Sequence, residues 1–432
     1  MGIYIYRVTF LLTFICISGL AIRRSAHVKS VDDFSVASRS LSGRGVSWII
    51  IGTLVGGVST IGTVQMAYTH GISAGIFTFG SSLSCFLLGC FFARPLREEK
   101  VITVSEYLGR YFGQRFRYYC STVNSAGMFI HVVAQFLAAI AILQSIFHCN
   151  DGLSVLLTMI LIGIFVITGG VTGAGLIGKV KFFMLYFIMF ISAATALYKT
   201  GGMETIIAML PRELDMLGFT RYGKSAAIVD LVSMLIGVLS TQIYLQAIFS
   251  AKDVREARNG AFLSATLIPP IGLLGIIIGL YLRGQYPELP VSPAQALPFY
   301  LEQTFPPALA AFFSAGILLT VLGTGAGLTL GVTTNIYNDF LSGKKILRRL
   351  TVPPITVVRL STLVVLAVAA LLVFSGLDSA ILRWSYMSMG MRGCAVFAGL
   401  FILVFFKQLA SSRLVLLLLY LLPITYILIN VR

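Results

Sequence analysis

Twelve apolar runs, each 18 residues or longer, follow one another along this chain and leave room for little else. A helix that crosses the hydrocarbon core of a membrane needs about 20 apolar residues. The composition agrees, because 57% of the residues are hydrophobic and only 11% are charged, against about 25% charged in a soluble protein. The sequence therefore predicts an all-α polytopic membrane protein and excludes soluble, disordered and disulfide-stapled classes. The runs are 3–22, 46–69, 73–93, 117–147, 152–169, 177–198, 225–249, 260–282, 306–337, 353–375, 385–406 and 412–431.

The basic residues predict how these helices are oriented. The chain has 32 Lys and Arg against 16 Asp and Glu, a balance that in a soluble domain would suggest a nucleic-acid partner. When the loops alternate across twelve spans, 22 of the 32 basic residues fall on one side, as expected for cytoplasmic loops. We therefore expect both termini outside and a multi-pass protein of the plasma membrane surrounded by lipid, with no nucleic acid and no obligatory protein partner.

Motifs for catalysis or cofactor binding are missing from the sequence. The six cysteines form no CxxC pair, and the four histidines show no metal-ligand spacing. The glycine-rich stretch at 323–329 lies inside a long apolar run rather than between a strand and a helix, so it does not read as a phosphate-binding loop. HExxH does not occur in the sequence. We expect no enzyme activity and no organic cofactor.

Two of the apolar runs contain features that interrupt a helix. The run 46–69 holds four glycines with Ser59 and Thr60, and the run 225–249 holds Gly237 just before Ser240 and Thr241. One interpretation is close helix packing through small residues. The other is a broken helix whose freed backbone groups face a cavity. Each run opens a block of five spans, and an odd number inverts the second block, which is the pattern of a transporter site at the membrane midplane.

This pattern divides the chain into two repeats with flanking segments. Residues 1–45 form an extra helix and a cytoplasmic loop, and residues 46–199 form the first inverted repeat. An outside loop at 200–224 precedes the second repeat at 225–406, and residues 407–432 form a last extra helix. The loops 199–224 and 283–305 are long and polar, and short surface helices fit there.

Several cytoplasmic motifs resemble those of the sodium/solute symporter family, which includes the sodium–glucose and sodium–proline transporters. Residues 33–41 are similar to D-F-x-x-A-G-R-S-L, with Ser38 in place of glycine, and residues 101–113 to T-x-x-E-Y-L-x-x-R-F-G. Residues 246–257 are similar to Q-R-x-x-A-x-K…A, with Ala247 in place of arginine, and Asp339 stands where the family has its acid. The resemblance covers about residues 31–410 and implies the leucine-transporter fold, a five-plus-five inverted repeat with about twelve transmembrane helices.

The resemblance also implies a sodium site between the first and eighth core helices. Carried over residue by residue, its ligands are backbone carbonyls and a hydroxyl position at Val55, Val58, Thr320, Gly323 and Thr324. Sodium is a hard cation that suits such oxygen ligands. Two differences from the family weigh against sodium. Gly323 replaces a hydroxyl residue, and the stretch at 178–181 carries two lysines where the family has an aspartate.

Lys179 and Lys181 have two possible roles. Some sodium-independent relatives of this fold place a lysine near the sodium position, so either residue is a candidate coupling group or sodium substitute. The alternative is that both are ordinary basic anchors at a cytoplasmic helix end.

Polar residues inside three spans are the candidate substrate contacts, because polar groups in a membrane are costly and are functional by default. For each of them, the alternative is that the polar side chain is hydrogen-bonded within the protein interior and has no contact with a solute. The candidates are Ser59, Thr60, Gln135, Ser240, Thr241 and Gln242. Arg392 within run 385–406 is a candidate for a substrate carboxylate or for an internal partner.

The sequence thus predicts a secondary active transporter, sodium-coupled, that moves a small organic solute by alternating access. A sodium-independent transporter of the same fold, proton-coupled or exchanging, remains the first alternative. The second is a solute-binding membrane sensor, which would need an output domain from a partner, since the chain ends directly after its last span.

Overall fold

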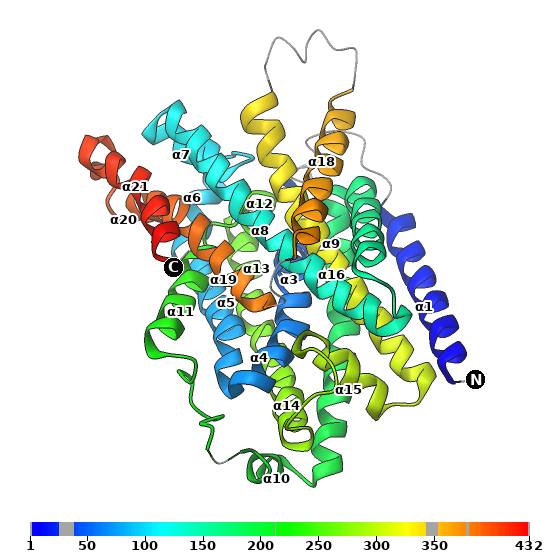
Figure 1. The fold of residues 1–432 in the computed structure, drawn as a ribbon. Coiled ribbons are helices and arrows are strands. Elements are labelled where there is room, and N and C mark those ends of the chain that lie inside the picture. Colours follow the sequence, from blue (N-terminus) through cyan, green and yellow to red (C-terminus); the bar gives the residue numbers. More distant parts are fainter. Residues whose placement is uncertain (1, 26–38, 212, 343–352, 377–379, 431–432) are drawn as a thin grey trace.

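The protein is a bundle of helices in the computed structural model (Figure 1), which describes residues 2–25, 39–211, 213–342, 353–376 and 380–430. Among these residues, the β structure consists of one isolated β-bridge, between Leu41 and Ala251. Most of the motif at 33–41, and the basic residues at 344–349, lie outside the described part of the chain. The all-α prediction is confirmed.

The helices follow the predicted runs closely. The first half forms α1 (Gly2–Ser25), α3 (Gly43–Leu54), η2 (Val58–Gly62), α4 (Thr63–His70), η3 (Gly71–Ala74), α5 (Gly75–Leu87), η4 (Leu88–Phe92), α6 (Ala93–Glu98), α7 (Val104–Phe112), α8 (Gln114–Phe147) and α9 (Asp151–Thr200). The second half forms α10 (Met203–Ala208), α11 (Lys224–Val238), α12 (Gln242–Phe249), α13 (Val254–Leu267), α14 (Pro269–Gln285), η5 (Pro293–Gln295), α15 (Ala296–Thr304), α16 (Pro307–Asn335), η6 (Ile336–Leu341), α18 (Pro354–Phe374), α19 (Ile381–Arg392), η7 (Gly393–Phe397), α20 (Ala398–Phe405), η8 (Lys407–Ser411) and α21 (Arg413–Asn430).

Eight helical stretches among the described residues are long and apolar enough to cross a membrane, and three shorter apolar helices accompany them. One difference from the sequence prediction concerns the runs 152–169 and 177–198. Helical backbone is assigned without interruption across both of them, as α9. The loops at 199–224 and 283–305 do carry short helices, α10 and α15.

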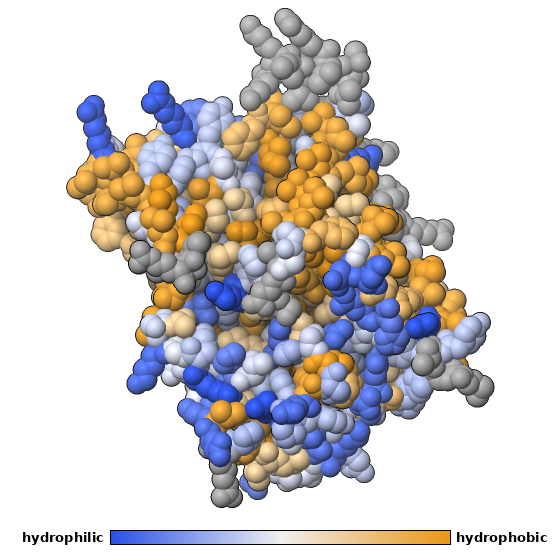
Figure 2. Space-filling view, viewed as in Figure 1, coloured by the Kyte–Doolittle hydropathy of each residue, from blue (hydrophilic) through white to orange (hydrophobic). Residues whose placement is uncertain are grey.

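The core of the bundle is built around α16. Its residues are buried from Ala310 almost without exception to Asn335, and it packs against α1, α3, α8 and α9. Small residues allow this close packing, since glycine and threonine let neighbouring backbones approach. Figure 2 shows apolar residues covering the upper part of the molecule, over α16 and α18, while hydrophilic residues gather at the end that carries α10 and α15.

The cytoplasmic motif at 101–113 folds into α7 for local reasons. Thr103 caps the helix by accepting a hydrogen bond from the Glu106 N–H at 3.0 Å, and Glu106 in return accepts one from Ile102 N–H at 3.1 Å. The arrangement is close to a capping box, with the difference that the second donor is the N–H of the residue before the cap. Gly113 ends α7 with a positive φ of 92°, a conformation that glycine adopts without strain.

Candidate functional site

The first interrupted helix lies between α3 and η2. Val55 is extended, with φ −92° and ψ 104°, and the helix resumes at Val58. The freed backbone groups are bound by predicted site residues. Ser59 Oγ accepts from Gly56 N–H at 2.8 Å, Thr60 Oγ1 donates to the Gly56 carbonyl at 2.7 Å, and Gln135 Oε1 on α8 accepts from Gly57 N–H at 3.1 Å. The prediction of a broken helix in run 46–69 is confirmed.

The second interruption separates α11 from α12 at residues 239–241. Thr241 Oγ1 donates to the Gly237 carbonyl at 2.6 Å, and Ser240 Oγ donates to the Ile236 carbonyl at 2.6 Å. The carbonyl of Ser240, freed by the interruption, accepts from Asn124 Nδ2 on α8 at 2.8 Å. Both interruptions therefore meet α8, which supplies Gln135 to one and Asn124 to the other.

The side chain of Gln242, which the sequence predicts as a substrate contact, forms hydrogen bonds to the segment before α7. Its Oε1 accepts from Val104 N–H at 2.9 Å, and its Nε2 donates to the Ile102 carbonyl at 2.9 Å. Its side chain thus fastens the segment before α7 to the start of α12. A glutamine at the first position of a helix is long enough to reach away from the interruption, which the sequence pattern does not reveal.

A lysine lies where the resemblance places the sodium ion. Lys181 on α9 is 1% exposed, and its Nζ donates to the Thr320 carbonyl at 2.8 Å, to Thr324 Oγ1 at 2.6 Å and to the Gly52 carbonyl. An ammonium has three N–H donors, and all three find oxygen acceptors here. Two of these acceptors, Thr320 and Thr324, are predicted sodium ligands.

The other predicted sodium ligands lie around this ammonium. The Val55 carbonyl accepts from Thr324 Oγ1 at 3.3 Å, so it borders the same spot. Val58 and Gly323 are buried on η2 and α16. Lys179 is exposed, two positions earlier on α9, and does not reach this cluster. The structure thus separates the two lysines.

A glycine makes the approach of Lys181 possible. A Cβ on Gly178 would lie 2.1 Å from the Trp48 carbonyl oxygen and 3.1 Å from Gly52 Cα. The backbones of α9 and α3 therefore touch, one turn from the point where Lys181 reaches Gly52.

We expect Gly178→Ala to destabilise the protein by about 2 kcal/mol, because an inserted methyl group that meets backbone cannot be accommodated by a side-chain rotation. The measurement is the thermal unfolding midpoint of the purified variant. Gly163→Ala on the same helix is the control, since its Cβ would be 3.6 Å from Leu366, an ordinary contact. Equal midpoints for the two variants would contradict the prediction.

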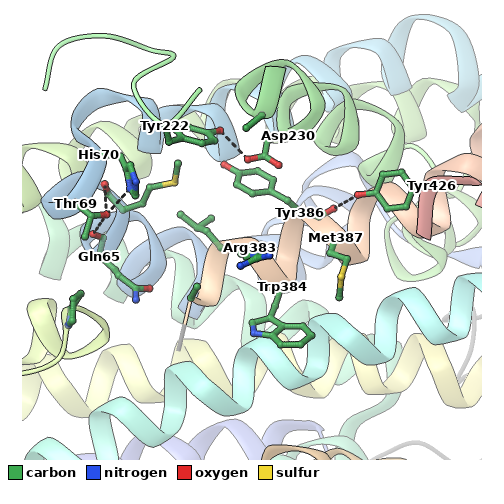
Figure 3. A pocket seen from close by; sticks show the side chains of 15 residues that line it. Gln65, Thr69, His70, Tyr222, Asp230, Arg383, Trp384, Tyr386, Met387 and Tyr426 are labelled. Carbon is green, nitrogen blue, oxygen red and sulfur yellow. Dashed lines mark hydrogen bonds between the residues drawn. The ribbon is translucent and has the colours of Figure 1, made fainter. Parts of the chain in front are cut away.

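A cavity of about 750 Å³ opens beside α4, α11, α19 and α21 (Figure 3). Tyr222, Asp230, Arg383, Trp384 and Tyr386 line it, and Tyr222 donates a hydrogen bond to Asp230 Oδ2 at 2.9 Å. Burial, and after it the charge of Asp230, raise the pKa of the Tyr222 hydroxyl, so the phenol stays protonated and remains the donor. Except for Asp230, a charge that stands out in run 225–249, no sequence pattern marks these lining residues.

The opposite end of the bundle is closed by an ion pair. Asp339, whose side chain is fully buried, accepts from Arg117 at 2.8 Å and from Thr103 Oγ1 at 2.9 Å. Arg117 also donates to the Asn338 carbonyl at 3.0 Å. Together with Gln242, these contacts tie α7 and α8 to η6 and α12. Among the described residues the cavity is thus at one end and the fastened contacts are at the other.

A buried arginine lies between these ends. Arg392, the last residue of α19, is 0% exposed. Its Nη2 is 3.3 Å from His131 Nδ1 on α8 and 2.6 Å from Met389 Sδ. His131 also lies 3.3 Å from Ser385 Oγ through its other ring nitrogen.

Comparisons with known proteins agree with this geometry. High-affinity choline transporter 1 of Drosophila melanogaster is 25% identical over 310 residues, which cover 69% of this chain and 49% of the relative. The chain thus spans about half the length of that relative.

The fold recurs in solved transporter structures. A Na⁺-coupled sialic acid symporter in a substrate-bound outward-open state superposes with a TM-score of 0.76 at 16% identity, covering 98% of this chain and 96% of that one. MhsT in complex with L-phenylalanine superposes with a TM-score of 0.59 at 13% identity, covering 90% and 97%. These likenesses establish the leucine-transporter-type fold.

The family model of the sodium:solute symporter family matches residues 34–413, nearly the whole chain and close to the span of the sequence resemblance. Its members are membrane transporters rather than enzymes. The chain belongs to the sodium:solute symporter family.

Proposed function

We propose that the protein is a secondary active transporter that moves a small organic solute across the plasma membrane by alternating access. The single observation that carries this proposal is the meeting of two interrupted helices at α8. Broken helices with backbone groups turned toward the protein interior are the means by which such transporters bind solutes at mid-membrane. The proposal includes twelve spans, both termini outside, and lipid around the apolar surface.

Ser59, Thr60, Gln135, Ser240 and Thr241 are the proposed solute-binding residues, because they lie in or beside the interruptions. Gln242 is a neighbour of the site that holds the segment at 102–104. In the transport cycle, solute binding would stabilise an occluded state. Release at the other end would then require the contacts around Asp339 to open.

Sodium coupling is the first candidate for the driving force, and family membership supports it. The proposed ligands are the carbonyls of Val55, Val58 and Thr320 with the Gly323–Thr324 position. The solved relative with the TM-score of 0.76 is a Na⁺-coupled symporter, which supports the same candidate.

A sodium-independent cycle is the second candidate, and one observation favours it. The Lys181 ammonium already carries a single positive charge into the oxygen cluster of Thr320, Thr324 and Gly52. A bound sodium ion would have to share these acceptors with an ammonium of like charge, which is unfavourable at such short range. Proton coupling through this lysine, or exchange, fits that arrangement.

We expect at least one small organic solute to raise the thermal unfolding midpoint of the purified protein, because a ligand that binds the folded state stabilises it by mass action, by about 2.7 kcal/mol at 100 times its Kd. Each solute is measured in sodium and in potassium buffers, at two pH values. Stabilisation only in sodium supports symport with sodium. Stabilisation that ignores sodium and follows pH supports the second candidate. No uptake into proteoliposomes of any stabilising solute would sink the transporter proposal.

A further inference from the structure

Arg392 is a buried cation whose charge is unbalanced. Its Nε and Nη1 have no hydrogen-bond partner among the described residues, and the ion pairs that these residues form do not include it. The contacts of its Nη2 are a histidine ring nitrogen and a thioether, neither of which carries negative charge. Arginine does not lose its proton in proteins, so burial cannot be relieved by neutralising it.

Such a group is costly to keep. Buried charges are normally paired or hydrogen-bonded. A charge that is left unpaired in the interior has lost its hydration and gains no partner in return. Orphaned buried polar groups in a native structure therefore point to a missing partner. A carboxylate would supply two acceptor atoms, one for Nε and one for Nη1, together with the negative charge that the guanidinium lacks.

Arg392 lies against α8 between the two residues that bind the interruptions, Asn124 and Gln135. If Gly127 on α8 carried a Cβ, that atom would lie only 3.0 Å from the Cβ of Arg392. The arginine therefore lies directly against α8. His131, one turn further along α8, and Gln135, one turn beyond that, lead to the first interruption. Asn124, one turn earlier on α8, holds the second interruption through Ser240.

Two further buried hydroxyls lack a partner, one near Arg392 and one beside the cavity. The hydroxyls of Tyr244 on α12 and Tyr386 on α19 are buried and have no hydrogen-bond partner among the described residues. Tyr386 lines the cavity, and Arg392 follows it by six residues, about 9 Å along the helix axis. Along α19, Tyr386 at the cavity thus precedes Arg392 in the interior.

We propose that Arg392 binds the anionic group of the transported solute, and that the solute is a small carboxylate. The planar guanidinium presents paired N–H groups that match the two oxygens of a carboxylate, and such charge-assisted pairs are strong. A cationic solute would instead meet two fully buried positive side chains, Arg392 and Lys181. This inference rests on the proposed transport function and specifies its substrate class.

The test compares carboxylates with the corresponding amides, which lack the negative charge of the carboxylate. Unfolding midpoints of the purified protein are measured with lactate, pyruvate, glycine and L-proline, with the amide of each, and with choline as the cationic comparison. We expect a carboxylate to raise the unfolding midpoint and its amide to leave the midpoint unchanged.

Arg392→Gln should weaken the binding of that carboxylate about 10- to 100-fold, since a hydrogen bond to a charged group is lost. Arg392→Lys should keep part of the binding. Arg359→Met, which removes an arginine from α18 away from both interruptions, should leave the response unchanged.

A second measurement does not depend on finding the solute. In solute-free buffer Arg392→Met should raise the unfolding midpoint, because it removes an unbalanced buried charge, and Arg392→Lys should not. A lower midpoint for Arg392→Met means that the charge is already balanced in the resting protein and overturns the inference. Stabilisation and uptake of choline or an amide, with no carboxylate effect, would overturn it too, yet leave the transporter proposal standing. Failure of every solute in uptake would count against transport itself.

Discussion

Replacing Lys181 with alanine is expected to destabilise the protein by about 3 kcal/mol or more, and to make its stability depend on sodium. Three acceptors each lose a donor at once, the carbonyls of Gly52 and Thr320 and the Thr324 hydroxyl oxygen, and Gly52 keeps a longer bond, from Thr324 Oγ1 at 3.4 Å. A buried acceptor left unsatisfied costs about 1–3 kcal/mol. The purified variant should therefore unfold at a lower temperature in potassium or choline chloride.

Sodium should restore part of that loss in Lys181→Ala. The vacated position keeps the Thr320 carbonyl and the Thr324 hydroxyl, and the Val55 carbonyl borders it at 3.3 Å from Thr324 Oγ1. Carbonyls of interrupted helices are typical sodium ligands in transporters. Without the competing ammonium, the oxygen cluster becomes a cation site of the kind that the family resemblance implies. The unfolding midpoint in sodium should exceed that in potassium for the variant and not for the unchanged protein.

Lys179→Ala is the matched control, because it removes the same charge two residues away from an exposed position. It should change neither the midpoint nor the sodium response. An unchanged protein that is already stabilised by sodium, with Lys181→Ala no different, would show that sodium binds elsewhere and would favour sodium-coupled symport. The experiment thus decides between the two candidates for the driving force.

The sequence predicts the interruptions because their cause is local. Several glycines and hydroxyl residues in one apolar run are unfavourable for a continuous helix that faces lipid. Both interruptions lie at the positions of these residues. What the sequence leaves open is which of two lysines turns inward. Lys179 and Lys181 are two positions apart, so they lie on nearly opposite sides of α9, and only the packing of Gly178 against Trp48 decides between them.

Long side chains and distant contacts explain the remaining differences. Gln242 was predicted to face the solute, but its amide bonds a segment 138 residues away in the sequence, and no local signal encodes that pairing. The cavity is lined by residues from four helices, among them Trp384, and by Tyr222 in the turn before α11. None of these contacts repeats with the period of a single helix, so sequence patterns could not have found them.

Asp339→Asn is expected to cost about 3 kcal/mol of stability and to open the end of the bundle opposite the cavity. The carboxylate is buried and holds Arg117 and Thr103 together, and removing one charge of a buried pair leaves the other uncompensated. Hydrogen exchange should rise in residues 101–113, since α7 loses its tie to η6, while α1 and α18 keep their rates.

Glu98→Gln is the control, because its pair with Arg94 is 3.0 Å long but well exposed on both sides and is worth less than about 1 kcal/mol. If exchange in 101–113 stays unchanged in Asp339→Asn, the pair does not hold this end closed. If exchange rises and solute affinity falls with it, closure at this end and solute binding at the interruptions are one coupled equilibrium, as alternating access requires.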